Sequence, residues 1–185
     1  MQSQNNAPKS AYEITLDPTA ESPHTLVVYV DNEPGVLARV VGLFSGRGYN
    51  IESLTVSEVE HERHISRITI LTTGRPKVIY QIRDQLERLV PVHRVAVLSN
   101  LDYEMIEQEL AMVKVRGTGD RRVEALRMAD AFGAKVVDAT LGSFIFQITG
   151  RSVEIERFIS LMQNMGLVEV ARTGIAAITR GENPL

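Results

Sequence analysis

The order of predicted strands and helices restricts the fold of this chain more than any other feature, because the same order occurs twice. In the first half, short apolar runs predict strands, and apolar residues spaced i, i+3, i+4 predict helices. The strands are expected at 24–30, 50–58, 64–72 and 92–98, and the helices at 34–46 and in the segment that ends before Pro91. Strand, helix, strand, strand, helix, strand is the order of a ferredoxin-like fold.

The second half repeats this order. Strands are expected at 110–115, 135–141, 143–149 and 167–171, helices at 121–132 and 152–165, and an additional edge strand at 175–179. We therefore predict an α+β protein of two tandem ferredoxin-like βαββαβ domains, each an antiparallel sheet with its helices on one face. A length of 185 residues fits two small domains.

The domain boundaries follow from these segments. The N-terminal domain is expected at 24–99 and the C-terminal domain at 110–185. The acidic segment 100–109 predicts an exposed linker that is compatible with a helix. Residues 1–23 contain no apolar run, so they predict a flexible N-terminal tail.

Helical spacing also predicts which side chains face the cores. The inward residues are expected to be Leu37, Val40, Val41 and Phe44 in the first helix, and Val123, Leu126 and Ala129 in the helix at 121–132. Asn32 or Glu33 is expected to cap the first helix.

Composition excludes several classes of protein. The chain has no cysteine, so disulfides, thiolate metal sites and cysteine nucleophiles are ruled out. A net charge of −3 argues against a uniformly basic surface for nucleic acid or anionic lipid. Because no stretch is long and apolar enough to span a membrane and no secretion signal precedes residue 24, we expect a cytoplasmic protein.

The motifs for catalysis and metal binding are weak. His61 and His64 are spaced for a metal site, but a solvated hairpin loop explains them better, and His24 and His93 have no paired nucleophile. The glycine-rich loop from Arg116 to Arg121 could bind an anion, as in acylphosphatase-type enzymes, although a capped turn accounts for the same residues. We therefore expect no catalytic residue and no metal site.

Base stacking on a sheet is a further alternative, because some four-stranded sheets of this class bind RNA through strand aromatics. Phe144 and Phe146 are the nearest candidates. With only 5% aromatic residues and an acidic chain, they are expected in the core instead. We therefore expect no nucleic-acid partner.

A sheet with both helices on one face leaves its other face and its edges uncovered. Domains of this size are marginally stable alone, so pairing of like domains between subunits is expected. We predict a homodimer.

The loop from Asp31 to Val36 is the most informative candidate for binding. A strand end meets a helix N-terminus there, and Gly35 allows close approach of a carboxylate. In an edge-to-edge dimer this loop could face the partner's turn at 48–51, where an amide could bind an α-amino group and apolar residues a small side chain. From spacing alone, a simple helix cap and a simple helix stop explain these residues equally well.

At this point a family resemblance is visible. The segment DNEPGVLARVVGLFSGRGYNIESLTV at 31–56 closely resembles the N-terminal ACT domain of the regulatory small subunits of acetolactate synthase, also called acetohydroxyacid synthase. The resemblance covers 24–181. It extends through SRITI at 66–70, QLERLV at 85–90, ELAMVKV at 109–115 and VEVARTGIAAITRG at 168–181.

The resemblance implies a non-catalytic protein that binds and activates the catalytic large subunit and makes it sensitive to valine. Thiamine diphosphate, Mg and FAD would belong to that large subunit. The implied effector site consists of Asn32, Gly35, Val36 and Leu37 of one chain with Asn50 and Ile51 of the dimer mate. An independent amino-acid sensor of the same domain type, and a small phosphatase that uses Arg116 or Arg121, are the alternatives.

Overall fold

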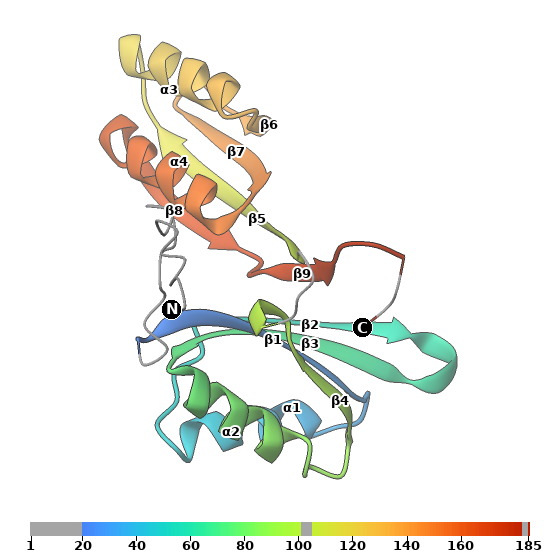
Figure 1. Cartoon of the computed structure of the whole chain (residues 1–185). Coiled ribbons are helices and arrows are strands. Elements are labelled where there is room, and N and C mark those ends of the chain that lie inside the picture. The colour runs from blue at the N-terminus through green and yellow to red at the C-terminus, as the bar shows by residue number, and fades with distance from the viewer. Residues whose placement is uncertain (1–19, 101–104, 183–184) are drawn as a thin grey trace, which may run out of the picture.

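The computed structural model describes residues 20–100, 105–182 and 185, and it contains two antiparallel sheets with helices (Figure 1). The first sheet has the order β2-β3-β1-β4 and the second β6-β7-β5-β8, with β9 also paired to β5. The first domain comprises β1 (Ser22–Asp31), α1 (Val36–Ser45), β2 (Ser53–Glu60), β3 (Ile65–Gly74), α2 (Pro76–Leu86) and β4 (Val92–Val97). The second comprises β5 (Met105–Arg116), α3 (Asp120–Ala131), β6 (Lys135–Ala139), β7 (Ser143–Gly150), α4 (Ser152–Met165), β8 (Leu167–Arg172) and β9 (Ala176–Thr179).

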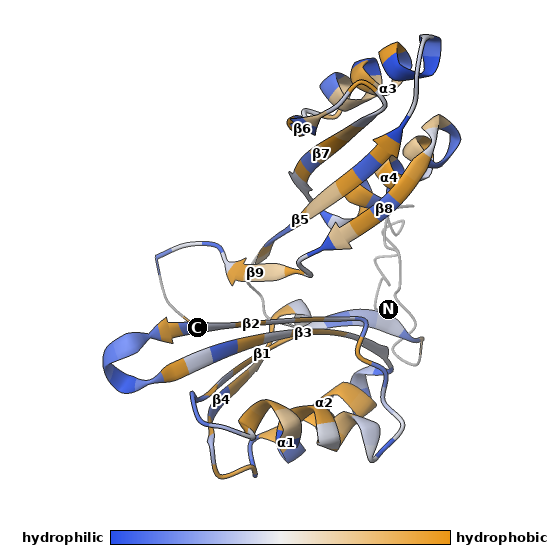
Figure 2. Ribbon diagram, turned by 180° about the vertical axis from the view of Figure 1, so that it is seen from behind, coloured by the Kyte–Doolittle hydropathy of each residue, from blue (hydrophilic) through white to orange (hydrophobic). Residues whose placement is uncertain are grey.

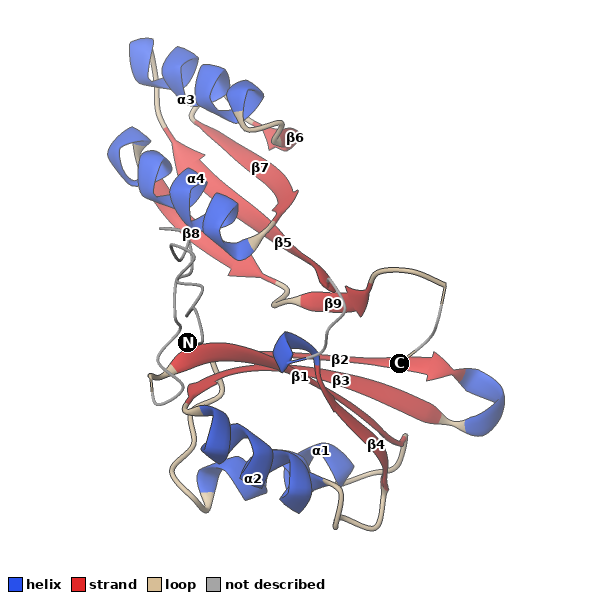
Figure 3. Ribbon diagram, viewed as in Figure 1, coloured by secondary structure: helices blue, strands red, loops and turns tan. Residues whose placement is uncertain are grey.

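This architecture confirms the predicted α+β class and the ferredoxin-like order in both halves. In each domain two helices cover one face of the sheet (Figure 3). The helix at 152–165 was predicted with the bounds that α4 has. The predicted edge strand at 175–179 forms β9, which pairs with β5 from Met105 to Gln108.

The core of the first domain lies between the sheet and α1 and α2. Because β1 is central, its side chains are buried along most of its length. The predicted stripe on α1 was wrong in part: Leu37 is 40% exposed and Val41 half-buried, whereas Val36 and Leu43 are buried. The apolar side of α1 is thus rotated from the predicted one, which leaves Leu37 on the surface.

The core of the second domain is built around aromatic residues. Phe146 of β7 contacts Phe158 of α4 edge-on, with ring centroids 6.2 Å apart. The predicted inward residues of α3 were wrong at two positions, since Val123 is 48% and Leu126 37% exposed, while Ala125 and Ala129 are buried. The buried side of α3 is thus formed by small residues, and Val123 and Leu126 lie toward its exposed side.

The segment predicted as an exposed linker at 100–109 differs in the structure. β5 begins at Met105, and Glu109 is only 4% exposed. Acidic composition indicated exposure, but Glu109 is buried by an ion pair that the sequence pattern does not show. Residues 101–104 lie outside the described residues. So do residues 1–19 of the predicted tail, whereas Ser22 and Pro23 already belong to β1.

The first sheet's free face, which was expected to need a covering, is covered in part by the chain's own C-terminal strand. β9 lies against the face opposite α1 and α2, and it is coloured as hydrophobic in Figure 2. Ile175 and Ala177, each 4% exposed, pack there against Val27 of β1 and Leu98. This cluster joins the two domains. Among the described residues, none of the helices combines the length and hydrophobicity needed to cross a membrane.

Candidate functional site

Four of the predicted site residues lie where β1 passes into α1: Asn32 and Gly35 in the loop, and Val36 and Leu37 in the first turn of the helix. Gly35 is the N-cap of α1 and has φ +87°, a conformation that favours glycine. A Cβ at Gly35 would meet no atom of the described residues within 4 Å, so the space outside the helix N-terminus is open. The exposed Leu37 side chain lies in the first turn beside this space.

The N-terminus of α1 is uncapped. In the described part of the chain no side chain bonds to it and its first turn contains no acidic residue, so the expected cap by Asn32 or Glu33 was wrong. Free N–H groups at a helix N-terminus carry a partial positive charge and bind carboxylates. Val36 is 3% exposed with its side chain in the core, and its N–H already donates to the Glu33 carbonyl at 3.3 Å, so this residue offers a ligand neither its side chain nor a free N–H.

Asn50 and Ile51 lie at the other end of α1. The helix has 10 residues, and at about 1.5 Å per residue its two ends are about 15 Å apart. Thr72 donates a hydrogen bond to the Asn50 carbonyl at 2.6 Å, which fixes the backbone while the Asn50 side chain stays exposed. One chain therefore does not bring the two halves of the predicted site together.

Glu58 is a neighbour of the site that the sequence did not single out. Partial burial raises the pKa of the Glu58 carboxyl, but hydrogen bonds from the side chains of Asn32, His61 and His64 outweigh it and lower the pKa overall. His61 and His64 lie 3.1 and 3.5 Å from this carboxylate. The ionised Glu58 carboxylate orients the Asn32 amide. The sequence does not reveal this pair, because it depends on how β2 lies relative to the loop after β1.

The base of the loop is fixed by bonds to neighbouring strands. Asp31 accepts a hydrogen bond from His93 of β4 at 2.6 Å. The Asn32 N–H donates to the His64 carbonyl at 2.6 Å. The base of the loop is thus held to β4 and to His64, the residue before β3, while its tip at Gly35 stays exposed.

The alternative sites of the sequence have structural explanations. The N–H groups of Arg116 and Gly117 donate to the carbonyls of Gly166 and Gly142, at 2.9 and 3.0 Å. These two N–H groups are therefore not free to bind an anion. Phe144 and Phe146 are 6% and 0% exposed and belong to the core. No group of three metal-ligating side chains occurs among the residues described.

His24 is buried, and its ring is held by two serine hydroxyls. It is 4% exposed, and its ring nitrogens lie 3.0 Å from the Ser22 hydroxyl and 2.9 Å from the Ser99 hydroxyl. Burial lowers the pKa of His24, although a backbone hydrogen bond at Gly74 opposes the effect. These contacts give His24 a structural role at the end of β1.

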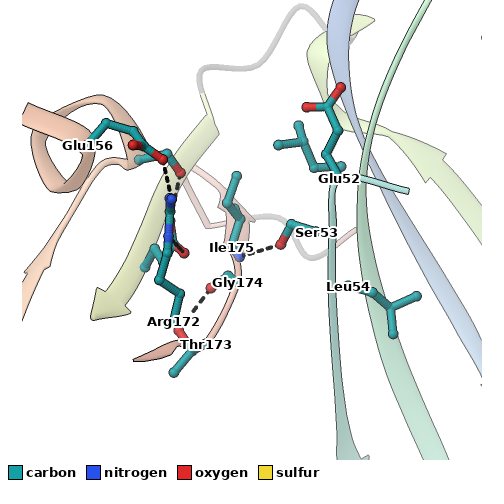
Figure 4. A pocket seen from close by; sticks show the side chains of 11 residues that line it. Glu52, Ser53, Leu54, Glu156, Arg172, Thr173, Gly174 and Ile175 are labelled. Carbon is teal, nitrogen blue, oxygen red and sulfur yellow. Dashed lines mark hydrogen bonds and ion pairs between the residues drawn. The ribbon is translucent and has the colours of Figure 1, made fainter. Parts of the chain in front are cut away.

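A second feature is the cleft of about 490 Å³ between the two domains (Figure 4). Arg172 of β8 binds both oxygens of the buried Glu109 at 2.7 Å and also contacts Glu156. Hydrogen bonds from Arg172, then from Ser152, lower the pKa of Glu109 despite its burial. The ion pair raises the pKa of Arg172, so both groups stay charged.

Known proteins match both domains of this chain. A family described as "AHAS small subunit-like ACT domain" matches residues 26–94, and one described as "Small subunit of acetolactate synthase" matches residues 108–181. A probable acetolactate synthase small subunit of Archaeoglobus fulgidus is 42% identical over 158 residues, which cover 85% of this chain and 97% of that protein. The acetolactate synthase isozyme 3 small subunit of Escherichia coli is 40% identical over 158 residues, 85% of this chain and 95% of that protein. The chain belongs to the acetolactate synthase small subunit family.

A solved structure agrees with this membership. The crystal structure of the acetolactate synthase small subunit from Thermotoga maritima is 36% identical, has a TM-score of 0.79, and covers 88% of this chain and 99% of that one. These comparisons confirm the resemblance to acetolactate synthase small subunits that the sequence showed. The first domain of this small subunit is the ACT regulatory domain.

Proposed function

We propose that this small subunit binds the catalytic large subunit of acetolactate synthase, raises its activity, and makes it sensitive to inhibition by valine. The observation that carries the proposal is the exposed, uncapped N-terminus of α1 beside Gly35, in a chain of this family. The chain is non-catalytic in this scheme. Thiamine diphosphate, Mg and FAD serve the large subunit, and the assembly works in the cytoplasm.

The effector site is completed by a second copy of the chain. β2 is an edge strand of the first sheet, and its side chains Val56 and Val59 are 42% and 43% exposed. An exposed edge strand with apolar side chains favours pairing with another strand. A homodimer built at this edge places the loop at 32–37 of one chain opposite Asn50 and Ile51 of its mate.

The chemistry of the loop suits an α-amino acid. The N–H groups of the first turn of α1 bind the carboxylate. Because the Glu58 carboxylate can only accept hydrogen bonds, the Asn32 amide turns its NH₂ group toward Glu58. Its carbonyl oxygen is then available to the α-ammonium group, together with the amide of Asn50 from the mate. Leu37 and the mate's Ile51 contact the aliphatic side chain.

Inhibition follows by linkage. An effector shifts a conformational equilibrium only by the difference between its affinities for the two states. Valine held between two chains stabilises one geometry of the dimer, and the large subunit is less active when bound to that geometry.

Acetolactate formation from pyruvate by the cognate large subunit tests this function. The rate is measured with and without this chain over a valine titration, with leucine and isoleucine as comparison effectors. We expect a rate increase that valine reverses. An unchanged rate and no valine response, with competent large subunit, would contradict the proposal and favour an independent amino-acid sensor.

A further inference from the structure

Two side chains of β2 bond to the backbone that follows β8. Ser53 accepts a hydrogen bond from the Ile175 N–H at 3.1 Å (Figure 4). Thr55 donates a hydrogen bond to the Thr173 carbonyl at 3.2 Å. We call Ser53, Thr55 and the segment Thr173–Ile175 the domain joint. Both bonds end on main-chain atoms of that segment, so they fix the position of its backbone relative to the first sheet.

Gly174 lies at the closest approach of the joint. Its φ is +81°, and a Cβ built on it would lie 2.5 Å from the Ser53 hydroxyl oxygen and 2.9 Å from the Thr55 hydroxyl oxygen. Such distances are far shorter than van der Waals contact, so any side chain at this position would displace the Ser53 and Thr55 hydroxyls that make the two bonds of the joint. The joint therefore depends on glycine for space as well as for backbone conformation.

The segment is attached firmly to the second domain. Arg172, which directly precedes it, forms the buried ion pair with Glu109 of β5. The Thr173 N–H donates to the Leu110 carbonyl at 3.0 Å, and the Thr173 hydroxyl accepts from the Leu110 N–H at 3.1 Å. A displacement at Gly174 therefore moves β5 and β8 with it.

The other side of the joint is attached to the proposed effector site. Ser53 begins β2 two residues after the proposed site residue Ile51. The Glu52 N–H donates to the Leu71 carbonyl at 2.9 Å, so the segment from 50 to 53 continues directly into the sheet. A ligand that orders Asn50 and Ile51 acts on a backbone that reaches the joint within a few residues.

The cleft beside the joint is a structural contact and not a second effector pocket. The charged groups that the second domain contributes to it already bind each other: Glu109 accepts from Arg172 and Ser152, and Arg172 also contacts Glu156. A ligand entering the cleft would have to replace these bonds instead of satisfying open ones.

We infer that the domain joint transmits effector binding from residues 50–51 to the second domain, with Ser53, Thr55 and Gly174 as positioning residues. The inference rests on the proposed function and deepens it. Effector binding and the inhibitory response are then separable: the first needs the loop at the N-terminus of α1, and the second also needs the joint.

The test compares Gly174→Ala with Gly133→Ala in the full chain. Gly133 has φ +66° and a Cβ there would meet nothing in the described residues within 4 Å, so this control carries similar backbone strain without touching the first domain. Valine binding is measured by calorimetry on the small subunit, and inhibition on the complex with the large subunit. Hydrogen exchange at 173–177 is followed with and without valine.

We expect Gly174→Ala to bind valine within about threefold of the natural chain, while its half-inhibitory valine concentration rises about tenfold, within the 5–150-fold range of allosteric coupling. Valine should slow exchange at 173–177 in the natural chain and in Gly133→Ala, but not in Gly174→Ala. If Gly174→Ala fails to fold, Thr55→Val replaces it, because it removes one joint bond with little change in volume.

Two results overturn the inference, and they are distinguishable. Unchanged inhibition and unchanged exchange in a folded Gly174→Ala or Thr55→Val would show that the joint transmits nothing. No binding heat for valine, leucine or isoleucine in the natural chain would instead remove the effector site, and the inference with it.

Discussion

The two domains share one order of elements but differ at the N-termini of their helices. In the second domain, α3 has Asp120 in its first turn, and α4 has a capping box in which Glu154 bonds to the Arg151 N–H at 3.0 Å. In the first domain, α1 has no acidic residue in its first turn among the residues described. The helices of the second domain thus have the chain's own carboxylates at their N-termini, whereas the N-terminus of α1 in the first domain has none from the described part of the chain. The fold that the two domains share therefore does not account for the proposed effector site, which depends on the uncapped loop at Gly35.

The largest expected effect comes from putting a carboxylate into that loop. Gly35→Asp would place a negative charge beside the carboxylate of the effector. Like charges about 4 Å apart repel by about 1 kcal/mol in water and about 4 kcal/mol near a protein surface. We therefore expect the half-inhibitory valine concentration to rise about 5- to 1000-fold, while activation of the large subunit persists.

The matched control is Gly133→Asp, which adds the same charge at a glycine of positive φ in the second domain. It should keep the natural valine response. Natural inhibition in Gly35→Asp, measured by acetolactate formation, would contradict the assignment of the site and remove the contrast between the domains.

The second contrast concerns ion pairs. Glu109 of the second domain is 4% exposed, and removing one partner of a buried pair typically costs about 3–5 kcal/mol. Since the Arg172 side chain is 31% exposed, we expect Glu109→Gln to lower the free energy of unfolding by about 3 kcal/mol or somewhat less. The pair Asp31–His93 of the first domain is exposed, so Asp31→Asn should cost less than about 1 kcal/mol.

Urea unfolding of the two variants, monitored by circular dichroism, measures the difference. Equal losses would mean that the burial of Glu109 does not distinguish its pair from a surface pair.

The pH dependence should also separate the domains. Burial lowers the pKa of His24 below its usual 6.5, so between that lowered pKa and 6.5 the unfolded chain binds more protons. The first domain therefore loses stability as the pH falls below 6.5. Hydrogen bonds from Arg172 lower the pKa of Glu109 below its usual 4.5, so the stability it contributes is complete above pH 4.5 and is lost only below it.

Hydrogen exchange from pH 7 to pH 4 measures this order, after correction for the intrinsic pH dependence of exchange. Amides of β1 should become less protected before amides of β5, and His24→Asn should flatten the change in β1 alone. Simultaneous loss of protection in both strands would show that the domains titrate as one unit.

The sequence predicted the order and most bounds of the elements because apolar periodicity is a local property, as at 152–165. It predicted the loop at Gly35 for the same reason, since a strand end, a glycine and a helix start are neighbours in the chain. It could not predict Glu58 beside Asn32, or Glu109 paired with Arg172, because those contacts join residues far apart in the chain and depend on how the strands are arranged in each domain. The pair of Glu109 with Arg172 also explains why the acidic segment is buried at Glu109 and not exposed as expected.

The smallest effects are expected at two leucines that helical periodicity wrongly predicted to face the core. Leu37 of α1 and Leu126 of α3 are 40% and 37% exposed, so neither contributes a fully buried side chain. Replacing either by Gln should change the free energy of unfolding by no more than about 0.5 kcal/mol, as for most surface substitutions. Leu37 lies in the first turn of α1, at the uncapped N-terminus, whereas Leu126 lies in the middle of α3.

Leu37→Gln should therefore raise the half-inhibitory valine concentration several-fold, because about 1 kcal/mol of apolar contact with the effector would be lost, whereas Leu126→Gln should leave it unchanged. Calorimetry of valine binding to the two variants separates this effect from a change in transmission, since Leu37→Gln should weaken binding itself. Equal valine binding by the two variants would show that the exposed Leu37 lies outside the effector site.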